Sequence, residues 1–380
     1  MIQPSSVISP RMRTWGALGL AMALGGQGVQ GCSESWLESL PEPSWDNADF
    51  SFATDVEGPI CGGTLDFQAG FVDRLQELFG QPRDGRRFTY YALSDDFFAQ
   101  WPCGEAKGCY RDGILLDQFL VDLHELVHPV LNLAHGPARR FVGEGLAEVF
   151  RDRHGGVLPL SSEIGLLEAI ARDWSDADEL ASLYARAGHF FAYVLDVHGP
   201  SVALDVYRSA DPGESAEAFQ AALERATGFT MDELVADYEA YPECPNREFR
   251  WPVMECSLAP SAWSGCAWQA HALIDCGLTD VMGPRAGEMW TVRVIDVPAD
   301  GDYRIYTFGD PAERAYVEIG GCTVGCSPDK YWIVEHGQTE VVHLSAGPHY
   351  VSLVRSEDRP GLSGVRIEFA DNAETSGCAP

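Results

Sequence analysis

Two short motifs carry most of the chemistry that this sequence can be expected to perform. The first is H-E-L-V-H at residues 124–128, and the second is E-G-L-A-E at residues 144–148. On an α-helix, positions four apart lie on the same face, so His124 and His128 can bind one metal ion. Glu125 flanks that face and can reach a water molecule at the same ion. The spacing therefore predicts a metal-binding helix of the zinc-protease type.

A catalytic zinc ion takes three protein ligands and keeps one position for water, so a third ligand is needed. We expect the turn at residues 134–137 to lead into an antiparallel helix from Arg140, which brings Glu144 back to the histidines. Glu148 lies one turn further on, where a carboxylate can accept the second ring N–H of a ligating histidine. The alternative interpretation of Glu148 is a glutamate on the exposed surface of the helix. His135 is the less favoured third ligand, because it follows His128 by seven residues and not by the six of the metzincin pattern.

The H-E-x-x-H pattern also occurs by chance, and two surface histidines with a salt-bridging glutamate are the alternative interpretation. The segment around it, residues 119–131, is apolar on nearly every side and therefore predicts a buried helix. A buried polar group without a partner costs about 1–3 kcal/mol, so buried histidines there need a ligand or a hydrogen bond. Pro129 removes a backbone hydrogen bond inside this helix and is expected to kink it below the metal.

Together the two motifs resemble the gluzincin clan of zinc metallopeptidases, and most closely its bacterial peptidase MA-like families. A Y-x-x-A-G-x-F pattern at residues 184–190 is similar to a later helix of those families, and the likeness covers residues 60–241 in order. The resemblance implies that Glu144 is the third zinc ligand, that the cofactor is Zn²⁺, and that the partner is a peptide or protein substrate. Pro129 departs from the family pattern.

The reaction expected at such a site is zinc-dependent hydrolysis of peptide bonds. Zinc lowers the pKa of a bound water molecule and polarises the scissile carbonyl. Glu125 then acts as the general base, which takes the proton of the water and passes it to the leaving amine. A hydrogen-bond donor should stabilise the oxyanion, and Tyr184 and His189 are candidates, although helix packing is the favoured interpretation for both.

The elements that must position this site follow from periodicity and from turn residues. Residues 64–80 predict an amphipathic helix and residues 87–93 a strand. Residues 113–116 are expected to form an edge strand beside the metal helix, suited to docking an extended peptide. A series of helices is predicted after the metal motifs, at residues 158–172, 176–197, 202–208, 215–227 and 231–241.

The composition changes near residue 245, where short alternating segments replace the helical pattern. Seven strands are predicted there, at residues 289–294, 301–307, 315–320, 331–335, 339–344, 349–355 and 364–369. Regularly spaced short strands favour a β-sandwich, and the turns at 299–303 and 345–350 resemble the pre-peptidase-like jelly-roll domains of secreted bacterial peptidases. The predicted fold class is α+β, with a mainly helical zinc metallopeptidase-like domain at 58–244 and a β-sandwich at 250–373.

The N-terminal 32 residues predict an export signal, with a basic start and an apolar run too short to span a bilayer permanently. The segment V-Q-G-C, which ends at Cys32, resembles the lipobox of bacterial lipoproteins, and an ordinary cleaved signal is the alternative. Residues 33–57 are polar and acidic and predict a flexible tether. A bacterial cell-envelope lipoprotein, at the outer membrane or cell surface, is therefore expected, with the periplasm or the medium as alternatives.

Cysteine usage points to the same oxidising compartment. Eleven cysteines leave ten for disulfides once Cys32 is set aside for lipidation. Cys103 and Cys109 are expected to form a local disulfide, and the pair Cys322 and Cys326 to be oxidised and not metal-binding. The β-sandwich should be cross-linked by its six cysteines, at positions 256, 266, 276, 322, 326 and 378.

The formal net charge of −31 argues against nucleic acid or an anionic membrane surface as a partner. Membrane attachment is expected only through an N-terminal lipid. A rival interpretation from another functional class is a non-catalytic surface lipoprotein with a degenerate metal site, whose β-sandwich binds protein or glycan.

Overall fold

The computed structural model describes residues 34–81, 85–100, 103, 107–152, 158–160, 164–172, 174, 180–312, 314–327 and 330–370. The predicted export signal and Cys32 lie outside these residues, and so does Cys378. The chain divides into two units, residues 1–40 with the short helix η1 (Glu34–Ser39), and residues 41–380 with all other elements. Within the described residues, every helix is too short or too polar to cross a bilayer.

The structure confirms the α+β class, and its first part is a five-stranded sheet. The strand order is β1 (Trp45–Asp46), β2 (Phe50–Thr54), β3 (Phe88–Ala92), β5 (Ile114–Asp117) and β4 (Gly108–Arg111). The three central strands are parallel and both edge strands are antiparallel. The edge strand beside the metal helix is therefore β4, and the expectation that residues 113–116 form the edge is wrong.

The tether predicted for residues 33–57 is also wrong over its second half. Residues 45–54 form β1 and β2, and Phe50 and Phe52 are fully buried. Phe50 stacks on Phe88 with a ring-centroid distance of 5.2 Å, so strand pairing buries apolar side chains that a tether would leave in water.

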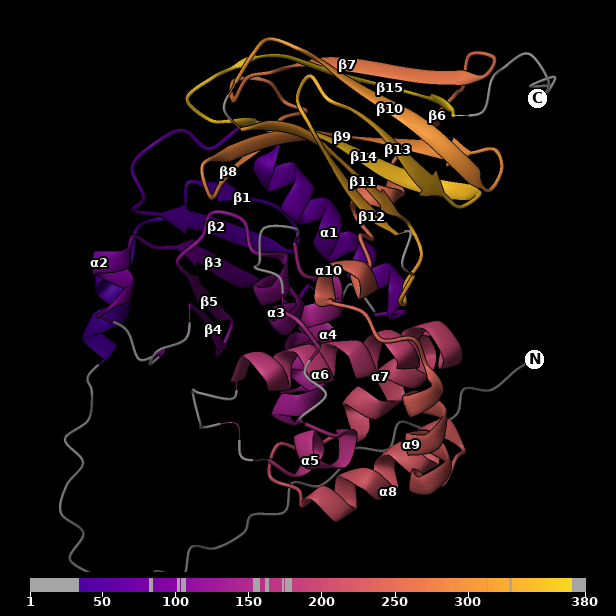
Figure 1. Cartoon of the computed structure of the whole chain (residues 1–380). Helices are drawn as coiled ribbons and strands as arrows, with labels where there is room; N and C mark the ends of the chain where they lie inside the picture. Colours follow the sequence, from indigo (N-terminus) through magenta and orange to yellow (C-terminus); the bar gives the residue numbers. More distant parts are fainter. Residues whose placement is uncertain are drawn as a thin grey trace, which may run out of the picture. The chain divides into compact units, whose positions relative to one another are not determined.

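Helices cover the sheet and continue the chain away from it (Figure 1). Their bounds are α1 (Thr64–Leu78), α2 (Asp95–Phe98), α3 (Leu123–His135), α4 (Arg140–Phe150), α5 (Leu166–Ala171), α6 (Leu180–Tyr193), the π-helical turn η2 (Val194–His198), α7 (Pro200–Ser209), α8 (Ala216–Thr227), α9 (Met231–Ala240), α10 (Asn246–Phe249) and η3 (Glu255–Ser257). Helices α8 and α9 begin at side-chain caps, since the hydroxyl groups of Ser215 and Thr230 accept backbone N–H groups there.

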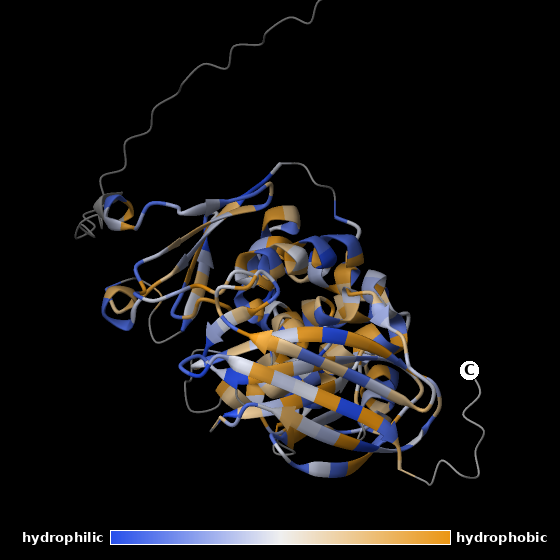
Figure 2. Ribbon diagram, turned by 90° about the horizontal axis from the view of Figure 1, so that it is seen from above, coloured by the Kyte–Doolittle hydropathy of each residue, from blue (hydrophilic) through white to orange (hydrophobic). Residues whose placement is uncertain are grey.

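The C-terminal part consists of two sheets that are antiparallel except for the short strand β6, as expected for a β-sandwich (Figure 1). The outer sheet has the order β13 (Thr339–Leu344), β10 (Gly301–Gly309), β15 (Gly361–Phe369) and β7 (Ala267–Ile274). The inner sheet has the order β12 (Tyr331–Glu335), β11 (Ala315–Gly321), β14 (Gly347–Ser356), β9 (Glu288–Val297) and β6 (Pro260–Ser261), with β8 (Met282–Arg285) also paired to β9. Strands of the outer sheet alternate hydrophilic and hydrophobic residues (Figure 2), which is the pattern of a sheet with one face in water.

The inner sheet is buried on both faces, because the helical part packs against the face that the outer sheet leaves open. On β9, Met289 and Ile295 join the core of the sandwich, whereas Trp290 and Val292 join the core that contains α1. Trp290 contacts Phe67 of α1 edge-to-face, with ring centroids 6.5 Å apart. Successive strand residues point to opposite faces, so β9 contributes to both cores and joins the two parts of the fold.

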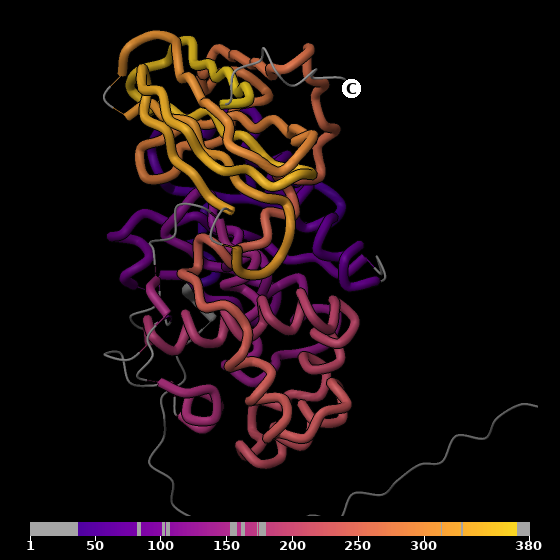
Figure 3. Tube along the Cα trace, turned by 45° about the vertical axis from the view of Figure 1, so that its right-hand side comes forward, coloured from indigo at the N-terminus to yellow at the C-terminus, as the bar shows by residue number. Residues whose placement is uncertain are grey.

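Disulfides strengthen this junction, and their pairing follows the expectation only in part. The predicted bond between Cys103 and Cys109 is present. Of the six cysteines expected to cross-link the sandwich, Cys256 and Cys322 pair with each other. Cys276 and Cys326 instead pair with Cys61 and Cys244, which precede the sandwich. The loop after β11 extends to the segment that follows α9 (Figure 3), which explains why Cys326 pairs with Cys244. Four disulfides among the described residues indicate an exported protein in an oxidising compartment.

Candidate metal centre

Helix α3 carries the H-E-x-x-H motif and begins at a well-formed cap. Asp122 is the N-cap residue, and its side chain accepts the backbone N–H of Glu125 at 3.3 Å. The helix continues through Pro129 to His135, so the proline is accommodated inside it. His124 and His128 lie on the same face, with ring centroids 5.4 Å apart. The cap thus fixes the first turn of the helix, where His124 and Glu125 lie.

The turn after α3 returns the chain as predicted, and α4 brings Glu144 to both histidines. Its Oε2 atom lies 3.2 Å from Nε2 of His124 and 3.5 Å from Nε2 of His128. Ligand atoms about 2.0–2.2 Å from a tetrahedral zinc ion are about 3.3–3.5 Å apart, so these separations fit zinc. Burial opposes ionisation of Glu144, but the imidazoles of His128 and His124 hold its pKa well below the usual range. Two imidazole nitrogens and one carboxylate oxygen form a donor set that zinc prefers.

Glu148 lies in the position expected for the carboxylate behind the first histidine. Its Oε1 atom is 3.3 Å from Nδ1 of His124, and its Oε2 atom accepts a hydrogen bond from Arg151 at 2.7 Å. The side chain of Glu148 is only 5% exposed, so water has little access to its contacts with His124 and Arg151. This arrangement holds the Nδ1 proton of His124 and leaves Nε2 for a metal ion.

Glu125 lies beside the three ligand atoms and packs against the edge strand β4. Its carboxylate, with His124 and His128, forms a group whose ligating atoms lie within 4.8 Å of one another. A Cβ atom at Gly108 would lie 2.4 Å from the carboxyl carbon of Glu125, so glycine at this position leaves room for the acid. Burial raises the pKa of Glu125 to about 7, against the lowering effect of both histidines.

The candidate metal centre lies in a cleft with a volume of about 810 Å³. One wall is the edge strand, including Gly108 and Tyr110, and another is α6, including Tyr184. Tyr184 lies 6.0 Å from the ring of His124, and burial raises its pKa to about 12, so its hydroxyl remains a hydrogen-bond donor. Arg285 and Ala286, from the sandwich, also line this cleft.

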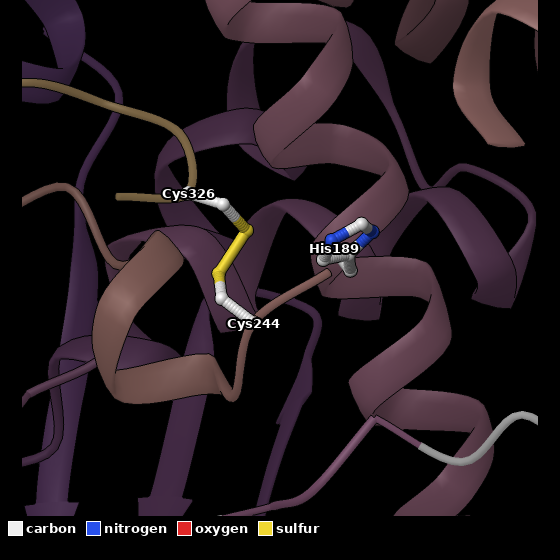
Figure 4. A group of neighbouring side chains, drawn as sticks. All are labelled: His189, Cys244 and Cys326. Carbon is white, nitrogen blue, oxygen red and sulfur yellow. A yellow bond between two sulfur atoms is a disulfide. The ribbon is translucent and has the colours of Figure 1, made fainter. Parts of the chain in front are cut away.

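His189, the other proposed oxyanion donor, is not among the residues that line the cleft and instead lies beside the disulfide Cys244–Cys326 (Figure 4). Its two ring nitrogens bond to the hydroxyl of Tyr238 and to the carbonyl oxygen of Pro242, each at 2.9 Å. It lies near Cys244 and Cys326, but these sulfur atoms are bonded to each other and offer no thiolate to a metal. His189 is therefore a buried packing residue, which was the interpretation favoured from the sequence, and its position does not support the candidate role as an oxyanion donor.

His189 makes stability depend on acid pH. Burial lowers its pKa to about 4, whereas an unfolded histidine has a pKa of about 6.5. Between these values the unfolded chain binds more protons, so the contribution is complete above pH 6.5 and is lost as the pH falls to 4. We expect this histidine to account for about 3 kcal/mol of unfolding free energy over that range. Urea unfolding at several pH values should show a flatter acid limb for His189→Gln, and an unchanged one for His271→Gln at an exposed site.

His135, the alternative third ligand, lies at the C-terminal end of α3. Its Nδ1 atom is 3.4 Å from Nε of Arg208, and its ring packs against Tyr207. Seven residues of helix separate it from His128, a rise of about 10 Å, so it cannot share the ion. Three further residues near the site, Asp122, Gly108 and Arg285, were not expected from the motifs. Only Asp122 had a local signal, as an N-cap residue three positions before a glutamate.

Comparisons with known proteins do not place the chain in a family. No protein-family model and no curated protein matches the chain. A carbohydrate binding module from Cellvibrio mixtus lichenase 5A, in complex with cellotriose, is 17% identical over 29% of this chain and 90% of its own, with a TM-score of 0.16. FeII HppE in complex with substrate is 11% identical over 48% and 98%, with a TM-score of 0.13. These TM-scores are too low to indicate a shared fold.

Proposed function

We propose that this chain is a zinc-dependent hydrolase of peptide bonds, related to the gluzincin metallopeptidases. His124, His128 and Glu144 would hold the ion, and Glu125 would act as the general base. The observation that carries the proposal is the convergence of two Nε2 atoms and one Oε2 atom at separations of 3.2 and 3.5 Å. Zinc bound there would activate a water molecule and polarise the scissile carbonyl.

Three side chains of this cleft have separate roles in the proposed reaction. Glu125 takes the proton of the attacking water and delivers it to the leaving amine. Glu148 keeps His124 in the tautomer that presents Nε2. Tyr184 donates a hydrogen bond to the oxyanion of the tetrahedral intermediate. The outer edge of β4 has no strand partner among the described residues, and an extended substrate can pair with it by β-augmentation.

Gly108→Ala should reduce activity without unfolding the protein. The added methyl group would lie 2.4 Å from the carboxyl carbon of Glu125, which is the mobile end of a flexible side chain. The side chain can move aside at little cost in stability, but the general base is then displaced. We expect kcat to fall at least about tenfold, while the melting temperature changes by no more than about 2 °C.

Gly143→Ala provides the matched control for this prediction. A Cβ atom at Gly143 would lie 4.0 Å from Nδ1 of His128, which is an ordinary contact distance. Activity should be retained, and alanine should stabilise the helix by about 1 kcal/mol. Equal kcat values for the two variants would contradict the placement of Glu125 against β4.

The proposed function is tested by metal analysis together with peptide cleavage. Purified protein should contain one zinc ion per chain, and His124→Ala should lose it. Chelation should abolish hydrolysis of a protein substrate such as casein, and added zinc should restore it. If wild type and His124→Ala both lack zinc, the proposal is wrong. Retained zinc without hydrolysis, together with binding of the full-length protein to a glycan array, would favour the surface-binding alternative.

We also propose that Cys32 is lipidated, which would anchor the enzyme at a bacterial cell envelope. The lipobox-like segment before it and the disulfides of the described residues support export. Wild-type protein should partition into the detergent phase of Triton X-114, and Cys32→Ser should move to the aqueous phase. Equal partitioning of the two proteins would contradict lipidation.

A further inference from the structure

A buried arginine of the sandwich reaches the first turn of the metal helix. Arg285, the last residue of β8, is only 5% exposed and donates a hydrogen bond from Nη2 to Oδ2 of Asp122 at 3.0 Å. The same nitrogen lies 3.5 Å from Oδ2 of Asp152, two residues after the end of α4. Arg285 also lines the metal cleft. A cation from the C-terminal part thus lies between the two helices that carry the metal ligands.

Asp122 connects this arginine to the proposed general base. One of its carboxylate oxygens accepts from Arg285, and the other accepts the backbone N–H of Glu125 at 3.3 Å. The carbonyl oxygen of Asp122 accepts the backbone N–H of Leu126, also at 3.3 Å. A carboxylate held at both oxygens has one orientation, so the bond from Arg285 fixes the cap of α3.

We propose that Arg285 is a positioning residue for Glu125, so that the β-sandwich is part of the active centre and not a separable binding module. The inference rests on the proposed function for its effect on catalysis. The inference has a structural half, which is that Arg285 orders the first turn of α3 through Asp122. This half does not depend on which reaction the protein catalyses.

The turn that carries Arg285 has a defined geometry. Arg285 and Glu288 pair across a two-residue hairpin between β8 and β9, and both intervening residues have positive φ, 53° at Ala286 and 79° at Gly287. This is the geometry of a type I′ turn, which is unfavourable for alanine and is retained only where the surroundings determine it. The guanidinium also lies 3.6 Å from the ring centroid of Phe119, just before α3. Turn and ring together fix the direction of the side chain.

The strand that carries the turn is attached to the helical part at its other end. The hydroxyl of Thr64, the first residue of α1, donates to the carbonyl oxygen of Gly283 at 2.7 Å and accepts its N–H at 3.0 Å. The disulfide Cys61–Cys276 links the preceding segments. Arg285 is therefore positioned by contacts to the helical part on both sides, as expected for a component of a preorganised site.

A purely structural role for Arg285 makes a different prediction. The arginine has three acids near it, of which Asp117 and Asp152 are buried and Asp122 is partly buried. Removal of the cation leaves these carboxylates uncompensated, so stability should fall in either case. Only a positioning role also predicts faster amide exchange confined to the first turn of α3, together with a lower kcat at unchanged KM, in protein that remains folded.

The test compares Arg285→Met, Arg285→Lys and the control Arg293→Met in zinc-loaded full-length protein. Arg293 pairs with Asp280 on the surface of the same sheet and lies outside the cleft lining. Hydrogen exchange should become about tenfold faster at the amides of Glu125 and Leu126 in Arg285→Met. Its kcat should fall about tenfold to a hundredfold with KM within threefold. Arg285→Lys, which keeps the charge, should recover part of both effects, and it replaces Arg285→Met if that variant does not fold.

Two outcomes overturn the inference. Unchanged exchange at the first turn of α3 in both Arg285 variants would show that Asp122 is held without the arginine. A kcat within twofold of wild type would show that the ordering does not serve the base. If the wild-type protein has no zinc-dependent peptidase activity, the proposed function fails, while accelerated exchange would still support the structural half of the inference.

Discussion

Glu125→Gln should lower kcat for peptide hydrolysis by about 10³-fold while the protein keeps its zinc. Glutamine has the same shape and fits the space beside Gly108, but it cannot accept a proton from water. General-base catalysis contributes about 10²–10⁴ in rate, and its loss should appear in kcat more than in KM. Steady-state kinetics with a fluorogenic peptide, together with elemental analysis for zinc, measure both quantities on the same preparation.

Glu77→Gln is the matched control, because Glu77 lies on the exposed surface of α1 and pairs only with Arg74 among the contacts described. This variant should keep both its zinc and its activity. A Glu125→Gln protein that hydrolyses peptide as fast as Glu77→Gln would remove Glu125 from the mechanism. Loss of zinc from Glu125→Gln would instead identify Glu125 as a ligand, which the proposed assignment excludes.

The part of the metal centre that sequence predicts best is the part that one helix builds. The geometry of His124 and His128 follows from helical periodicity alone, since four residues make about one turn. Glu144 required one further step, a short turn through Gly136 with the second helix returning antiparallel. Gly136 has a positive φ of 82°, which glycine adopts readily, so the turn also had a local signal. Local rules therefore predicted where each ligand lies.

Residues that act across long separations in sequence could not be predicted in this way. Arg285 meets Asp122 only because the sandwich packs on the helical part, and Gly108 meets Glu125 only because β4 forms the sheet edge. The disulfide Cys61–Cys276 joins residues 215 positions apart, and nothing in the spacing of cysteines encodes such a pairing. These contacts are products of tertiary packing, which composition and periodicity do not specify.

The tether predicted for residues 33–57 is an error of another kind, because ordered structure there has only a weak local signal. In residues 50–54 only two large apolar side chains, Phe50 and Phe52, alternate with small or polar residues, within a polar and acidic segment. Alternation over five residues is a short signal. It becomes a strand because β3 offers a parallel partner and because α1 covers the buried face, which again are contacts between distant segments.

Glu144→Ala should reduce the affinity for zinc by more than about 100-fold. Mutation of a residue that merely supports a ligand costs about 10–100-fold in metal affinity, so loss of a direct ligand should cost more. His124 and His128 would remain as two ligands, and two imidazoles bind a zinc ion less firmly than the complete donor set. Competition with a chromophoric chelator measures this affinity directly and needs no substrate.

His135→Ala distinguishes the two possible third ligands in the same assay. His135 lies at the far end of α3 beside Arg208, so its removal should leave zinc affinity within about threefold of wild type. Wild-type affinity in Glu144→Ala, combined with weak binding in His135→Ala, would reverse the assignment. The distances favour Glu144 as the proposed third ligand, because its Oε2 atom lies within 3.5 Å of both histidine nitrogens. A zinc ion bound by both histidines would take its third ligand on that side, where α4 presents Glu144.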